Sequence, residues 1–117
     1  MFSYEQIAEA IEAEGRRIGK LAEECADVAQ NAAEAEADYK MDFAKARMQI
    51  RDDAAAVGNK VTVSEVDDMA LLEASESHRT YLVASSALTA IREALRASQA
   101  RLDGLRSLAA GYRQAGG

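Results

Sequence analysis

The chain has no proline, no tryptophan and a single cysteine, and each shortage narrows the possible folds. Because proline is absent, no residue among the 117 forces a helix to kink or stop. One cysteine excludes an internal disulfide and is typical of a reducing compartment, so we expect a cytoplasmic protein. Only two Phe and four Tyr are present, which leaves few large side chains for a globular core.

Alanine is abundant instead, with 26 copies in the chain. It is the best helix former, but its small side chain contributes little buried apolar area. This composition favours long helices that pack closely along a thin seam, within a single domain over residues 1–117.

Two capping signatures mark where helices begin. Ser3 and Gln6 can cap each other's backbone, and Thr62 and Glu65 repeat the arrangement. Between them, Gly58 suits the left-handed residue that follows a helix end. We therefore predict a helix over about 4–56, a turn over 57–62, a second helix over about 63–112 and a frayed tail over 113–117.

Apolar residues recur in both predicted helices at alternating spacings of three and four, the heptad pattern of a coiled coil. After Tyr39 the pattern slips by one residue, which indicates a stutter or, alternatively, a kink or break. Val66, Met69 and Leu72, with Met48 of the facing helix as a further candidate, are expected to continue the seam of the second helix. The main seam residues are Ile7, Ile11, Ile18, Leu21, Val28 and Tyr39 in the first helix, and Tyr81, Leu88, Ile91, Leu95, Leu102 and Leu105 in the second.

These features predict an all-α fold: a long, coiled-coil-like antiparallel hairpin whose helices are joined by one short turn. Leu82, Val83, Leu108 and Phe43 lie beside the seam and widen the apolar face beyond what two helices need. We therefore expect a homo-oligomer, assembled as a helical bundle or a ring.

The sequence offers little for catalysis. His78 is the only histidine, and its acidic neighbour Glu76 does not have the spacing of a metal-binding pair, so we interpret it as a solvated helix residue. Cys25 occupies a seam position among acids and is expected to be an inert core thiol. We predict no enzyme activity, metal, cofactor or small-molecule substrate. No membrane association is expected either, because neither a signal peptide nor a long apolar run is present.

The formal charges are segregated along the chain. Residues 1–38 carry ten acids and three bases, a net charge of −7, whereas residues 88–117 carry five arginines and two acids, a net charge of +3. Arg92, Arg106 and Arg113 occupy one heptad position, Arg96 stands nearby, and Tyr112 lies at the end. Arginines on one face beside an aromatic ring can follow a phosphate backbone and stack a base.

The same arginines have a structural alternative. In an antiparallel hairpin Arg92 comes near Glu24 or Asp27, and Arg106 near Glu9 or Glu12. Charge pairs flanking a seam commonly set the orientation of two helices. The sequence leaves both readings open.

Part of the second helix resembles a known family. Tyr81-Leu82, the run from Ser85 to Arg92 and the segment from Leu105 to Ala109 resemble the C-terminal helix of small phage recombination mediators of the UvsY type. The segment from Glu36 to Lys40 resembles small helical proteins of tailed phages. The resemblance implies a ring-forming protein in the host cytoplasm that binds single-stranded DNA and helps to load a recombinase. The candidate phosphate contacts are then Arg92, Arg96, Arg106 and Arg113.

A second function fits the acidic first helix. A coiled-coil adaptor or inhibitor could use this helix to bind a basic surface on a host or phage protein. We therefore carry two expectations, a recombination accessory protein and a protein-binding adaptor.

Overall fold

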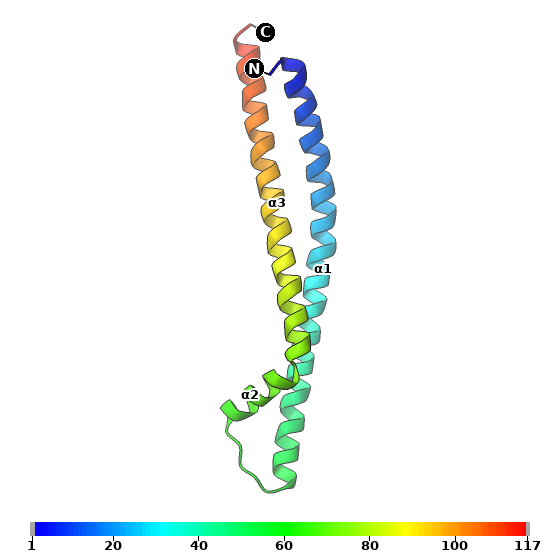
Figure 1. The fold of residues 1–117 in the computed structure, drawn as a ribbon, viewed down its shortest axis with the longest axis vertical. Coiled ribbons are helices and arrows are strands. Elements are labelled where there is room, and N and C mark those ends of the chain that lie inside the picture. The colour runs from blue at the N-terminus through cyan, green and yellow to red at the C-terminus, as the bar shows by residue number, and fades with distance from the viewer. Residues whose placement is uncertain (1, 117) are drawn as a thin grey trace. The chain divides into compact units, whose positions relative to one another are not determined.

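The computed structural model describes residues 2–116, and their regular structure is entirely helical. Helix α1 spans Tyr4–Ala56, α2 spans Val63–Glu73 and α3 spans Ser75–Gln114 (Figure 1). The prediction of an all-α fold is confirmed. Helix α3 continues two residues past the expected end, so within the predicted tail only residues 115 and 116 of the described chain are non-helical, while Gly117 lies outside it.

The predicted helix ends are present. The Gln6 N–H donates to Ser3 Oγ over 3.2 Å, and the Ser3 N–H donates to Gln6 Oε1 over 2.8 Å, which completes a capping box. Gly58 has a φ of 72°, and its N–H donates to the Ala55 carbonyl. This left-handed residue ends α1 and lets the chain turn toward α2.

The prediction of one helix over 63–112 is wrong, because the helix is interrupted at Ala74, between α2 and α3. Ala74 is only 3% exposed, and its carbonyl accepts from both the His78 N–H and the Ser77 hydroxyl. A serine that donates to a helix carbonyl competes with the regular backbone pattern and bends helices. No glycine or proline lies at this position, so no helix-breaking residue indicates the interruption. By contrast, α1 runs without a break through Tyr39.

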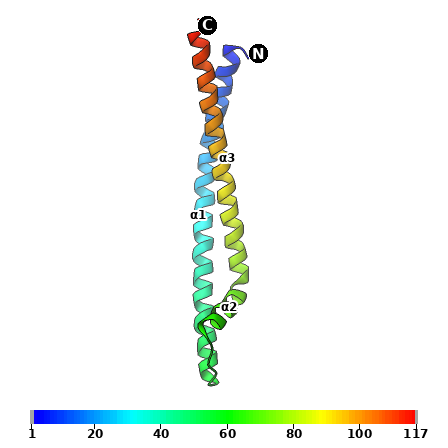
Figure 2. The same cartoon turned by 90° about the vertical axis from the view of Figure 1, so that its left-hand side faces the viewer.

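The helices form two compact units. Unit 1 comprises the described part of Met1–Val28 and Leu88–Gly117, and unit 2 comprises Ala29–Ala87. In unit 1 the beginning of α1 and the end of α3 lie side by side and run antiparallel, with both chain ends together (Figures 1 and 2). The Tyr112 hydroxyl donates to the Phe2 carbonyl, and Arg101 meets Glu14, which fixes the antiparallel direction.

In unit 2 the second half of α1 packs against α2 and the start of α3. Tyr39 stacks on His78 and Tyr81 of α3, with ring centroids 4.6 and 5.9 Å apart. Helix α2 turns Val66 and Ala70 inward, where they are 1% and 0% exposed.

The expected extension of the seam along α2 is confirmed at Val66 but is wrong at Met69, at Leu72 and at Met48 of α1, which is 64% exposed. Met69 is 48% exposed and Leu72 is 76% exposed, because the inward face of α2 is formed by other residues. The bend at Ala74 changes which side of the chain faces α1. Elsewhere, all twelve main seam residues are buried or half-buried, and the other fully buried positions are mostly alanines.

Candidate nucleic-acid interface

The basic residues of unit 1 lie along one helix. Arg92, Arg96, Arg106 and Arg113 all come from α3 and are all exposed; we refer to them as the arginine row. Arg92, Arg106 and Arg113 differ by multiples of seven residues, or two helical turns, so they leave α3 on the same side. The alternation of Leu88, Leu95 and Leu102 in the seam fixes which side faces α1.

No residue of the arginine row forms a salt bridge within residues 2–116. The pairs expected from the sequence, Arg92 with Glu24 or Asp27 and Arg106 with Glu9 or Glu12, are therefore not formed in this part of the chain. By the heptad pattern, the corresponding seam-flanking positions of α1 hold small residues, Ala8, Gly15 and Ala22. An acid there would lie within reach of these guanidinium groups, and its absence leaves them to solvent.

Arg101 behaves differently from the arginine row. Its Nε lies 3.3 Å from Glu14 Oε1, and the Glu14 side chain is only 18% exposed. Glu14 thus lies at a seam position inside the helix pair. Its second carboxylate oxygen, Oε2, is buried and has no hydrogen-bond partner in the described chain. This contact accounts for the one acid in the seam and removes Arg101 from the set of free cations.

Tyr112 is engaged in a contact between α3 and the start of the chain in unit 1. Its ring is half-buried and lies beside Leu108, Gly111 and Ala115, while its hydroxyl is bonded to Phe2. A phenol held in this way closes the end of the helix pair. Its stacking on a nucleic-acid base stays a prediction.

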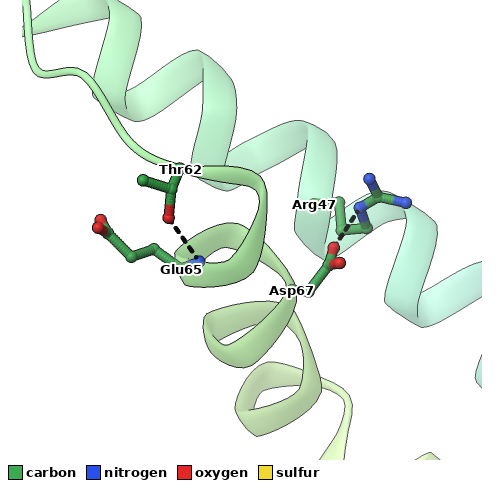
Figure 3. A network of polar contacts seen from close by, with 4 residues as sticks. All are labelled: Arg47, Thr62, Glu65 and Asp67. Carbon is green, nitrogen blue, oxygen red and sulfur yellow. Dashed lines mark hydrogen bonds and ion pairs between the residues drawn. The ribbon is translucent and has the colours of Figure 1, made fainter.

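Two ion pairs lie in unit 2. Arg47 Nε is 3.0 Å from Asp67 Oδ1 and joins α1 to α2, although the two groups are not aligned as a hydrogen bond (Figure 3). Lys40 lies 2.8 Å from Glu36, whose hydrogen bond and charge raise the pKa of the lysine. Both lysine and carboxylate are exposed, so this pair adds little to stability.

Sequence reasoning missed three features. His78 is half-buried and stacked on Tyr39, so its interpretation as a solvated residue is wrong. Arg16, Arg17 and Lys20 line one surface of α1 and form a cationic cluster, whose three- and four-residue spacing was visible in the sequence. An apolar hollow of about 200 Å³ lies between α1 and α3 in unit 1, lined by Phe2, Gln6, Ile7, Ala10, Leu105 and Leu108.

Within residues 2–116 no three His, Cys, Asp or Glu side chains are grouped as metal ligands. The free Cys25 is half-buried. In that part of the chain, no helix combines the length and the apolar character needed to cross a bilayer.

Neither the known protein families, nor curated protein sequences, nor solved structures gave a match.

Proposed function

We propose that this protein is a non-enzymatic, self-associating helical protein that binds single-stranded DNA through the arginine row. The observation that supports this most is the exposure of four arginines without an acidic partner in the described chain. Long charged side chains beside an acidic helix would ordinarily pair with it, and within residues 2–116 these four arginines do not. The resemblance to UvsY-type mediators implies a more specific role, in which the protein helps to load a recombinase onto the strand.

The mechanism is electrostatic. Each guanidinium group that contacts a phosphate releases counterions from the strand, so binding weakens as salt rises. Guanidinium groups also pair with phosphate oxygens through two parallel hydrogen bonds. One chain offers four such groups, and self-association multiplies them along a shared surface.

Self-association is supported by the exposed apolar surface. Phe2 and Leu72 are more than half exposed, at 67% and 76%, and Met69 is 48% exposed. Apolar side chains of this size in water favour a partner surface.

A salt titration tests the proposal. If four arginines meet phosphates, the affinity for a single strand falls with a log–log slope of about −3, or about 50-fold between about 50 and 200 mM salt. The variant with Arg92→Glu and Arg106→Glu should lose most of this binding. The control variant, Arg51→Glu with Arg79→Glu, changes exposed arginines of unit 2 by the same total charge and should bind as the wild type does.

Three outcomes would count against the proposal: no binding at about 50 mM salt, equal losses in the two variants, or a preference for duplex. Circular dichroism checks that each variant keeps its helices. Within residues 2–116, Arg92 and Arg106 form no salt bridge that these substitutions would break and both are exposed, so folding should be retained.

The acidic adaptor remains the second candidate because of one observation. Glu5, Glu9, Glu12, Glu23 and Glu24 are exposed, and none forms a salt bridge within the described chain. This alternative would be established if the protein binds a basic partner through α1 and does not bind nucleic acid in the titration.

A further inference from the structure

Helix α2 presents an outward face with two kinds of residue. Glu65, Asp68, Met69 and Leu72 recur at spacings of three and four, so they share one side of the helix, and all four are exposed. We call these four residues the α2 outer face. Its acids occupy the first half of the helix and its apolar residues the second half.

The opposite side of α2 is already occupied. Val66 and Ala70 are buried in unit 2, and Asp67 is paired with Arg47. Figure 3 shows Glu65 directed away from this pair. Helix α2 contains four acids and no basic residue, so its outer face favours a partner that is apolar at one end and cationic at the other.

Unit 1 carries a surface with that pattern. The apolar hollow is walled by Phe2 and Leu108, which are 67% and 45% exposed. Along α1 from Ala10 of the hollow, the cationic cluster begins at Arg16, about 9 Å away at 1.5 Å per residue. The α2 outer face is about 10 Å long from Glu65 to Leu72, which matches the distance of about 9 Å between the near edges of the hollow and the cluster.

This surface and the arginine row occupy different sides of unit 1. Leu108 and Arg106 are two residues apart on α3, so they leave the helix in directions about 200° apart. Leu108 lies seven residues from Arg101, whose contact with Glu14 marks the same side as the hollow. A partner on the hollow therefore leaves the arginine row open to DNA.

We infer that the α2 outer face of one copy docks on the apolar hollow and cationic cluster of a second copy. Met69 and Leu72 fill the hollow, while Glu65 and Asp68 meet the cationic cluster. Two α2 outer faces packed antiparallel on each other would give no acid a basic partner, which disfavours a self-complementary contact. The contact joins different surfaces of the two copies, so it repeats from copy to copy and yields a ring or a filament.

This inference rests on the self-association in the proposed function, and single-site variants with mixing test it. Leu72→Glu removes the outer face and leaves the hollow, whereas Leu108→Glu removes the hollow and leaves the outer face. Both positions are exposed, so the chains should fold. In sedimentation velocity at micromolar concentration, each variant alone should run as a monomer, and an equal mixture should form a dimer with one copy of each.

Val83→Glu is the matched control, because Val83 is 66% exposed and belongs to neither surface. It should associate as the wild type does. A monomeric wild type would overturn the inference, as would a Leu108→Glu chain that still assembles to the wild-type size or a mixture that stays monomeric.

Charge reversal gives a second, milder test. Glu65→Arg with Asp68→Arg, and separately Arg16→Glu with Arg17→Glu, should each weaken association at least tenfold, and mixing the two should restore it. If the mixture of the two charge-reversed chains does not associate at low salt, Glu65 and Asp68 do not meet the cationic cluster. If the monomeric Leu72→Glu chain still binds DNA, the docking contact is not needed for binding by the arginine row. If the Arg92→Glu, Arg106→Glu chain assembles but does not bind DNA, the docking contact and the DNA-binding surface are separate.

Discussion

Units 1 and 2 contain parts of the same two long helices, α1 and α3, but they pack by different means. Unit 1 follows a regular heptad pattern, and its buried residues are mainly small, with Ile7, Ser98 and Ala109 at 2%, 0% and 4% exposure. Within residues 2–116, the aromatic contacts all belong to unit 2, where Tyr39 meets Phe43, His78 and Tyr81.

The difference shows what each kind of packing allows. A regular seam uses one stripe of each helix and leaves its two sides free, so unit 1 can carry arginines on one side and a hollow on another. Large rings need more room between helices than alanine does, and in unit 2 they coincide with the slip in the heptad pattern and the bend at Ala74. Unit 2 thereby exposes α2.

The substitution with the largest expected effect tests whether the units are energetically separate. Ile7→Ala removes a side chain that is 2% exposed and should lower the free energy of unfolding by about 2–4 kcal/mol. Hydrogen exchange should show faster exchange in unit 1 and nearly unchanged protection in unit 2. Equal loss of protection in both would mean that the two units unfold together.

The aromatic contacts of unit 2 offer the converse test. Tyr39→Leu removes stacking on His78 and Tyr81 and should cost about 1–2 kcal/mol of unfolding free energy, measured by urea denaturation. Tyr4→Leu is the control in unit 1, where Tyr4 is 45% exposed and has no aromatic contact in the described chain. Similar losses in both variants would show that ring stacking does not distinguish unit 2.

The seam of unit 1 contains a carboxylate that a regular heptad does not need. Glu14→Leu should raise the free energy of unfolding by about 1 kcal/mol, because it replaces an incompletely bonded buried acid with an apolar side chain. Thermal unfolding measures the change, and Glu12→Leu at an exposed position should leave stability nearly unaltered. A loss of stability in Glu14→Leu would show that the Arg101 contact contributes more than apolar packing.

The smallest effect concerns helix propensity. A methyl group at Gly15 would meet no atom within 4 Å, so Gly15→Ala should stabilise unit 1 by about 0.5–1 kcal/mol. Gly58→Ala should instead destabilise the chain by about 1 kcal/mol, because its φ of 72° is unfavourable for a residue with a Cβ. Chemical denaturation distinguishes the signs, and a destabilising Gly15→Ala would indicate that something packs against this glycine in solution.

Much of the architecture was predictable because it depends on local chemistry. Ser3 with Gln6, Gly58 and the alternation of apolar residues fix the caps, the turn and the seam over short stretches of sequence. The bend at Ala74 was not predictable, since it depends on a buried alanine and the Ser77 hydroxyl rather than on a helix-breaking residue.

The candidate site was predictable only in part. The spacing of Arg92, Arg106 and Arg113 placed them on one side of α3, but whether acids reach them depends on the register of α1. The apolar hollow joins residues about one hundred positions apart, such as Phe2 and Leu108, and no local pattern reveals it.

Sedimentation equilibrium tests the central claim, that this helix pair covers its exposed apolar surface with copies of itself. At micromolar concentration the account predicts an average mass at least twice the 12.6 kDa of one chain, falling toward 12.6 kDa in Leu72→Glu. A wild-type mass of 12.6 kDa at that concentration, with the helices intact by circular dichroism, would contradict it.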